Sequence, residues 1–150
     1  MRMSEQGLDL LIQREGSRNR AYRDSVGILT IGVGHTGPDV HPGLVWTDAQ
    51  IKDTFAKDIE RFEAAVNADT KDKLNQHQFD ACVSFAFNIG TGGFHRSEVL
   101  RCILIGAWEG AARAFDNWHI PPEITSRRNG EREQFKGTHF VPTYDERQSA

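Results

Sequence analysis

Two carboxylates and a hydroxyl near the N-terminus could together perform acid–base chemistry. Glu15, Asp24 and Thr30 follow the spacing E-x8-D-x5-T. Taken singly, each has an ordinary interpretation: an exposed carboxylate at a helix end, a turn residue and a β-branched strand residue. Taken together, they form a pair of carboxylates in unlike surroundings beside a hydroxyl. Such a pair is what cleavage of a glycosidic bond requires.

The surroundings of the three side chains suggest a role for each. Glu15 continues the apolar helix face of Leu11 and Ile12, close to the negative end of the helix dipole. We therefore expect Glu15 to stay protonated and to act as the general acid. Asp24 follows an arginine-rich stretch and should stay ionised, so that it either stabilises an oxocarbenium-like transition state or activates a water. Thr30 could hold that water.

The elements that must position these residues are a helix and a hairpin. Ser4 can cap a helix that Gly16 ends. A turn over residues 24–27 then joins a strand near residues 21–23 to a second strand over residues 28–35. Alternation sends Leu29, Ile31 and Val33 to one side of the second strand, and Ile28, Thr30, Gly32 and Gly34 to the other. The glycines on the Thr30 side would leave room for a bulky ligand.

The rest of the chain is predicted to be helical. A capping box at Thr47 and Gln50 opens a single amphipathic helix of roughly 20 residues, and a second box at Asn75 and Gln78 opens an almost wholly apolar one. Further helices are expected at 97–105, 107–118 and about 125–136.

The predicted fold class is α+β, mainly helical, in a single domain over residues 1–150. A small lobe with the hairpin (about 13–60) is joined by the long helix to a larger helical lobe (about 61–137 plus 1–12), with an extended tail at 138–150. A cleft between two such lobes is a common ligand site.

Composition narrows the possible partners. The chain is 38% hydrophobic and 26% charged, with a net charge of −3, so nucleic-acid binding is not expected. The apolar run at residues 10–12 is too short for a signal peptide or a membrane span, which predicts synthesis in a cytoplasm and no stable membrane contact.

Cys82 and Cys102 lie in apolar helical patterns and are expected to be buried free thiols rather than a disulfide. Histidines and cysteines lack metal-ligand spacing, and neither a metal nor a cofactor is predicted.

These motifs resemble a known family. The triad Glu15, Asp24 and Thr30, followed at once by IGVGHTG, is similar to the catalytic signature of the phage-type lysozymes, or endolysins (glycoside hydrolase family 24). FNIG at 87–90 resembles the family's helix that faces the cleft, and SRRNGEREQF at 126–135 resembles its closing helix. The resemblance covers about residues 4 to 137 and implies a lysozyme-like fold.

The resemblance also implies an activity. It implies hydrolysis of the β-1,4 bond between N-acetylmuramic acid and N-acetylglucosamine in peptidoglycan, with inversion and with neither metal nor cofactor. By position it makes Gly34, His35, Thr36, Phe87 and Ser97 candidate saccharide contacts. It further implies a phage lysis enzyme, expected to be a monomer. Such an enzyme would accumulate in the host cytoplasm and reach the wall in the periplasm after a holin opens the membrane, with no direct contact to the holin.

Alternative hypotheses remain at this point. The chain could be a lysozyme-fold scaffold that binds peptidoglycan without turnover, although an intact triad argues against it. A sugar-binding module of another fold would need exposed aromatic residues rather than paired carboxylates. We expect His35 to be structural, held by an acid such as Asp58, and Trp108 and Trp118 to belong to the core. Three arginines of the closing helix form either a solvated face or a site for anionic wall groups: Arg127, Arg128 and Arg132.

Overall fold

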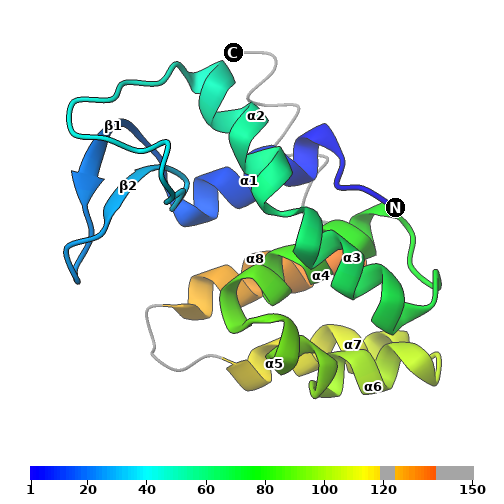
Figure 1. Ribbon diagram of the computed structural model, residues 1–150. Helices are drawn as coiled ribbons and strands as arrows, with labels where there is room; N and C mark the ends of the chain where they lie inside the picture. Colours follow the sequence, from blue (N-terminus) through cyan, green and yellow to red (C-terminus); the bar gives the residue numbers. More distant parts are fainter. Residues whose placement is uncertain (119–123, 138–150) are drawn as a thin grey trace, which may run out of the picture. The chain divides into compact units, whose positions relative to one another are not determined.

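The computed structural model describes residues 1–118 and 124–137, and the predicted tail at 138–150 lies outside the described residues (Figure 1). The chain divides into two compact units. One unit is Leu8–Arg61, and the other comprises Met1–Gly7 together with Phe62–Ala150.

The N-terminal helix α1 (Glu5–Glu15) begins and ends where the sequence predicts. The Ser4 hydroxyl accepts a hydrogen bond from the Gly7 N–H at 3.0 Å, as an N-cap side chain does. The helix ends because Gly16 adopts φ of 78°, and its N–H donates to the Ile12 carbonyl at 2.8 Å. Glu15 is therefore the last helical residue.

The hairpin directly follows, and its second strand is shorter than predicted. Strands β1 (Arg18–Arg23) and β2 (Leu29–Gly32) pair antiparallel, with Tyr22 opposite Thr30 (blue in Figure 1). Beyond Gly32 the chain turns back on itself, since Ile31 and His35 exchange both backbone hydrogen bonds at 2.9 Å. The predicted strand over 28–35 is therefore wrong after Gly32.

Both glycines of this turn have a conformational reason, and for Gly32 it replaces the predicted one. Gly32 and Gly34 have φ of 65° and 66°, in the left-handed region that favours glycine. A Cβ on Gly32 would lie 3.4 Å from the Trp46 ring and 3.5 Å from Ile51. Gly32 is thus small because the turn and the packing of Trp46 require it. The expectation that Gly32 leaves room for a ligand is wrong.

The predicted long helix is interrupted once. It forms α2 (Asp48–Asp58) and α3 (Glu60–Thr70), and the predicted capping box between Thr47 and Gln50 is present. Ile59 between them stays in the right-handed helical region, at φ −86° and ψ −4°, and its N–H still donates to the Phe55 carbonyl at 3.0 Å. The amphipathic pattern could not locate this interruption because it continues through Ile59, which is buried.

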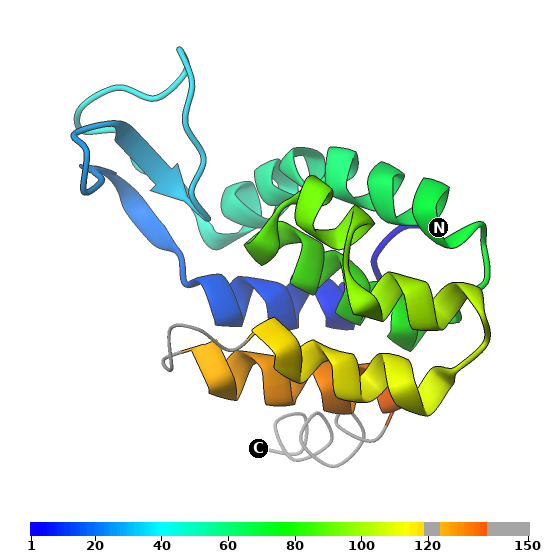
Figure 2. The same cartoon turned by 90° about the horizontal axis from the view of Figure 1, so that it is seen from below.

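The unit that contains Phe62 onward is a helical bundle. Its helices after α3 are α4 (Gln76–Ile89), α5 (Thr91–His95), α6 (Glu98–Leu104), α7 (Trp108–Ala114), the short 3₁₀ helix η1 (Phe115–Trp118) and α8 (Thr125–Lys136). Helix α8 packs against α4, α7 and η1, and Figure 2 shows α7 and α8 side by side. The second predicted capping box opens α4, whose residues 79–86 are all buried. Cys82 and Cys102 are buried free thiols, as expected.

The observed fold is mainly helical α+β with an N-terminal hairpin, which confirms the predicted class. Among the described residues, no helix is both long enough and apolar enough to cross a membrane.

Candidate active site

Glu15 lies at the junction between α1 and the hairpin. Its side chain is partly buried, and β1 begins at Arg18, after the Gly16 turn. The acid at the end of an apolar stripe is therefore held between a helix and a strand of the same unit. The unit Leu8–Arg61 also contains Asp24 and Thr30.

Asp24 is fixed by the turn that it starts. Its Oδ1 accepts hydrogen bonds from the N–H groups of Val26 (3.0 Å) and Ile28 (2.8 Å). Its own N–H donates to the Ile28 carbonyl at 2.9 Å, so the strand pairing continues to this residue. The turn role and the chemical role are therefore compatible, because two backbone donors hold the carboxylate in one orientation.

Thr30 lies on β2, and its side chain is buried, with 3% exposure. The hydroxyl donates to the Ile28 carbonyl at 2.9 Å. Tyr22 opposes Thr30, and Asp24 opposes Ile28. Directly opposed residues of an antiparallel pair share a face, and so do residues two apart on one strand. The register therefore brings Asp24 and Thr30 to the same face of the hairpin as diagonal neighbours.

His35, in the turn after β2, is held by two acids. Its Nδ1 lies 2.7 Å from Asp58 and its Nε2 lies 3.0 Å from Asp39. Burial acts to lower the His35 pKa, but the hydrogen bonds and charges of Asp58 and Asp39 outweigh it, and the pKa is raised above 6.5. The expectation that Asp58 holds His35 is confirmed. Asp39 is a second partner that the sequence reasoning missed, although its i, i+4 spacing was visible.

The other predicted saccharide contacts are distributed between the two units. Gly34 and Thr36 are exposed beside His35 in the unit Leu8–Arg61. Phe87 belongs to the helical unit, is partly buried and makes an edge contact with Phe62 at 5.0 Å between ring centroids. Ser97 is buried and caps α6, since its hydroxyl accepts from the Leu100 N–H at 3.1 Å. The Ser97 hydroxyl also donates to a backbone carbonyl, so its role in this structure is to cap the helix.

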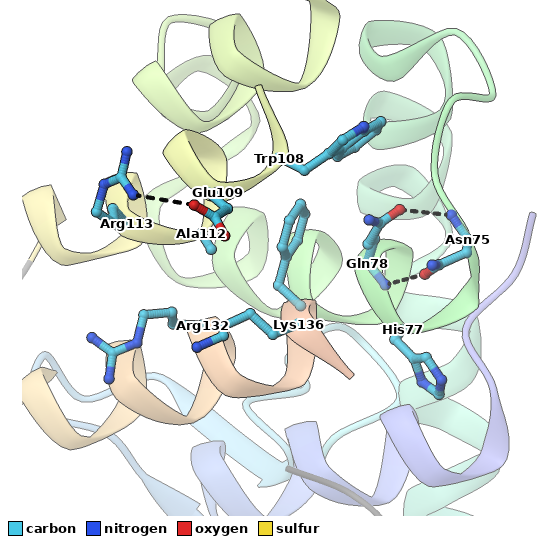
Figure 3. A pocket seen from close by; sticks show the side chains of 10 residues that line it. Asn75, His77, Gln78, Trp108, Glu109, Ala112, Arg113, Arg132 and Lys136 are labelled. Atoms are coloured by element: carbon cyan, nitrogen blue, oxygen red, sulfur yellow. Dashed lines mark hydrogen bonds and ion pairs between the residues drawn. The ribbon is translucent and has the colours of Figure 1, made fainter. Parts of the chain in front are cut away.

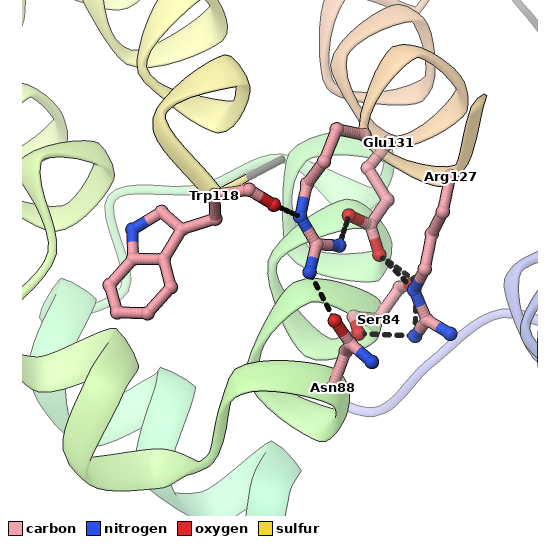
Figure 4. Close-up of polar contacts among 6 residues, drawn as sticks. Ser84, Asn88, Trp118, Arg127 and Glu131 are labelled. Atoms are coloured by element: carbon pink, nitrogen blue, oxygen red, sulfur yellow. Dashed lines mark hydrogen bonds and ion pairs between the residues drawn. The ribbon is translucent and has the colours of Figure 1, made fainter. Parts of the chain in front are cut away.

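The arginines of α8 do not all form a solvated face, and the structure excludes that alternative for two of them. Arg128 is fully buried, and it donates to the Trp118 carbonyl at 2.7 Å and to Glu131 at 2.6 Å (Figure 4). Arg128 also donates to Asn88. Arg127, with an 11% exposed side chain, donates to the same Glu131 at 3.1 Å. The i, i+3 and i, i+4 spacing to Glu131 was the signal that the sequence offered.

Trp108 and Trp118 are only partly core residues, so that expectation also needs correction. They are 37% and 36% exposed. Trp108 packs on Phe135, with ring centroids 6.3 Å apart, and Trp118 packs on Phe85 at 6.1 Å. Each indole therefore contacts the core and still presents surface to solvent.

Comparisons with known proteins identify the family. A sequence profile described as phage lysozyme matches residues 12–131, which include the whole hairpin with Asp24 and Thr30. The chain belongs to the phage lysozyme family. This phage lysozyme is 38% identical over 143 residues to the endolysin of Salmonella phage P22, an alignment that covers 90% of this chain and 98% of that protein.

Solved structures agree with this membership. A crystal structure of a mutant P22 lysozyme superimposes with a TM-score of 0.86 at 38% identity, covering 91% of this chain and 99% of the other. An endolysin from Escherichia coli O157:H7 phage FAHEc1 gives a TM-score of 0.82 at 33% identity and covers 90% and 93%. The chain therefore has the lysozyme fold, and its function is that of a phage endolysin that degrades peptidoglycan.

Proposed function

We propose that the chain hydrolyses the β-1,4 bond between N-acetylmuramic acid and N-acetylglucosamine, with inversion at the anomeric carbon. Glu15 is the general acid, Asp24 the base or electrostatic stabiliser, and Thr30 the residue that holds the attacking water. The observation that carries this assignment is the strand register, in which Asp24 and Thr30 share one face of a hairpin that follows Glu15 directly.

The hydrogen bond of Thr30 defines how it would act. Its proton is donated to the Ile28 carbonyl, so the hydroxyl oxygen is left to accept. A water that donates one hydrogen to Thr30 and the other to the Asp24 carboxylate would direct a lone pair at the sugar. As the water attacks the anomeric carbon, its proton passes to Asp24, while Glu15 protonates the departing oxygen.

The anchoring of Asp24 supports the same mechanism. Because Val26 and Ile28 hold Oδ1, the carboxylate cannot swing freely toward the sugar. A fixed carboxylate suits a base that acts through an intervening water, and inverting enzymes keep their two carboxyl groups about 6.5–9.5 Å apart to leave room for that water.

Further parts of the proposal concern substrate contacts and location. We assign saccharide contacts to Gly34, His35 and Thr36, supported by the exposed turn that carries them, and to Phe87. For Ser97, the buried hydroxyl that caps α6 supports a structural role instead. Membership among phage endolysins supports a monomer that is made in the host cytoplasm and reaches the periplasm after a holin opens the membrane.

The experiment compares the wild type with Glu15→Gln on Gram-negative cells stripped of their outer membrane. Glu15→Gln removes the proton donor at nearly constant volume, and loss of general acid catalysis should slow clearing by about 10² to 10⁴-fold. Asp53→Asn, on the exposed side of α2 in the same unit, is the control for the loss of a carboxylate and should clear normally. Thermal melting confirms that each variant is folded.

Three outcomes would contradict parts of this proposal. A Glu15→Gln variant that keeps more than about a tenth of the wild-type rate removes Glu15 from its role. A wild type that binds the wall without clearing cells supports the scaffold alternative. In the wild-type digest, NMR should detect the α anomer first, whereas a β anomer would indicate retention through a covalent intermediate.

A further inference from the structure

A groove in the helical unit belongs to no part of the site described above. It has a volume of about 520 Å³, within the range of about 300–1,000 Å³ that is usual for small-molecule sites. Its walls come from the start of α4, from α7 and from the C-terminal end of α8 (Figure 3). Helices α7 and α8 pack against each other, so the two walls are fixed relative to each other.

One wall of the groove is aromatic. Trp108 borders it with 37% of its surface exposed, and the indole is supported by Phe135, which is almost fully buried. The π face of tryptophan carries a negative quadrupole and attracts the weakly positive C–H bonds on one side of a pyranose ring. A supported indole at a groove therefore offers a platform for a sugar.

The groove lining also carries positive charge, from Arg113 on α7 and from Arg132 and Lys136 on α8. The single carboxylate of the lining is that of Glu109. The Arg113–Glu109 pair is long, at 4.0 Å, and both side chains are highly exposed, so it contributes little. Arg132 is paired with Asp116 at 3.0 Å and lies 3.5 Å from Glu133, and Lys136 lies 3.9 Å from the same Glu133. Both acids are outside the groove lining. The lining itself therefore carries more cationic than anionic side chains, on a chain whose net charge is −3.

We propose that this groove is a non-catalytic binding site for an acidic saccharide. The sugar ring packs on Trp108, and its carboxylate or phosphate accepts hydrogen bonds from Arg132 and Lys136. Guanidinium and ammonium groups give short, charge-assisted bonds to such anions. A neutral sugar would use only the indole, and an apolar ligand would desolvate the cations without compensation.

The test is an NMR titration of the full chain with sugars that share one ring. The probes are N-acetylmuramic acid, which carries a carboxylate, N-acetylglucosamine 6-phosphate, and neutral N-acetylglucosamine. The indole N–H signal of Trp108, assigned with Trp108→Phe, reports on the groove, and that of Trp46, whose ring centroid lies 5.4 Å from that of His35, reports on the other unit. At least one acid should move the Trp108 signal at a concentration about tenfold lower than the neutral sugar does, and added salt should weaken this effect.

Charge variants separate the groove from general surface charge. Arg132→Gln combined with Lys136→Gln should weaken acid binding at Trp108 by about tenfold or more and leave neutral-sugar binding unchanged. The control combines Lys73→Gln with Arg101→Gln, two exposed cations of the same unit outside the groove. If the double variant melts early, Lys136→Gln alone replaces it.

The proposal is overturned if acidic and neutral sugars shift Trp108 equally, if only Trp46 responds, or if the control pair weakens binding as much as the groove pair. A response to the carboxylate probe alone or the phosphate probe alone supports the proposal and identifies the anion. Because these monosaccharides are not cleaved, the result does not depend on whether Glu15→Gln abolishes lysis.

Discussion

At the scale of single residues, the Thr30 hydroxyl can serve both the hairpin structure and the proposed catalysis. It satisfies the Ile28 carbonyl next to the Asp24 turn, and its position on β2 puts it on the face that Asp24 shares. The hydroxyl proton makes the bond to the Ile28 carbonyl, and the oxygen lone pairs remain to accept a hydrogen bond from the attacking water. Substitutions at this position can therefore separate strand stability from catalysis.

Thr30→Val should reduce activity by at least about tenfold, which corresponds to roughly 1.4 kcal/mol of transition-state stabilisation. It should also cost about 1 kcal/mol in unfolding free energy, because the Ile28 carbonyl loses one of its two hydrogen bonds and keeps only that from the Asp24 N–H. Thr30→Ser keeps the hydroxyl and should retain most activity. Turnover of purified peptidoglycan per folded molecule, with thermal melting alongside, measures both effects. Full activity in the folded fraction of Thr30→Val would show that Thr30 is only a strand residue.

His35 makes a pH-dependent contribution to the free energy of unfolding. Burial acts to lower its pKa, but Asp58 and Asp39 outweigh burial and raise it in the folded protein, and bonding to His35 lowers the pKa of Asp39. A raised histidine pKa means that the folded state binds the proton more tightly. The stabilisation by protonated His35 is therefore complete below about pH 6.5. It is lost as the pH rises through the pKa of His35 in the folded protein.

We accordingly expect wild type to lose stability relative to His35→Gln as the pH rises from about 6 to 8. The measurement is the free energy of unfolding in urea across this range. His41→Gln, at an exposed loop residue whose ring lies 3.1 Å from the neighbouring Pro42 carbonyl, is the control and should run parallel to wild type. A constant difference between wild type and His35→Gln would show that the two acids do not stabilise protonated His35.

At the scale of elements, the start of α1 is fixed by a contact far along the chain. Ser4 caps the helix and also donates from its hydroxyl and its backbone N–H to Asp80 of α4. Burial raises the pKa of Asp80, although bonds from Ser4 and Gln76 act in the opposite direction. Gly7 allows the approach, because a Cβ there would lie 2.4 Å from the Asp80 carboxyl carbon.

Gly7→Ala should therefore destabilise the protein, although alanine is the better helix former by about 1 kcal/mol. The added methyl must displace Asp80, and overpacking of this kind costs about 1–3 kcal/mol. Gly92→Ala is the control, since its Cβ would meet only the flexible end of Arg96 at 3.3 Å. Urea unfolding of both variants measures the difference, and a stabilised Gly7→Ala would mean that Asp80 moves at no cost.

At the scale of the whole molecule, the helical unit is joined by a buried ionic cluster. Glu131 of α8 accepts from Arg127 and Arg128 and from Ser84 of α4, while Arg128 reaches the Trp118 carbonyl of η1 (Figure 4). Helix α8 thereby meets α4, which is distant in sequence, and the nearby η1 through buried charge. Each member is costly to leave without its partner.

Glu131→Gln should destabilise the protein by about 3–5 kcal/mol, because it leaves the fully buried Arg128 without its carboxylate. Asp116→Asn removes one of two acidic partners of the more exposed Arg132, the other being Glu133, and should cost less than about 1 kcal/mol. Urea unfolding with a common m-value compares the two. Equal costs would show that charge pairing contributes little to the cluster.

The sequence by itself determined what depends on neighbours within about four residues. The capping boxes at Thr47 and Asn75, the end of α1 at Gly16 and the turn at Asp24 are all local, and they could be predicted because side chain and backbone partner lie in one short segment. The triad and its motif likewise predicted the family that the comparisons confirm.

Only the tertiary structure decided which face of α8 is buried and why the IGVGH turn contains two glycines. Arg128 is buried because its acceptors come from α4, η1 and its own helix, and no spacing within α8 could reveal the first two. Gly32 packs against Trp46, and Ile31 pairs with His35, so a pattern that alternates like a strand forms a turn instead. Local patterns specify which elements can form, whereas partners from distant segments decide which polar groups can be buried and where a strand ends.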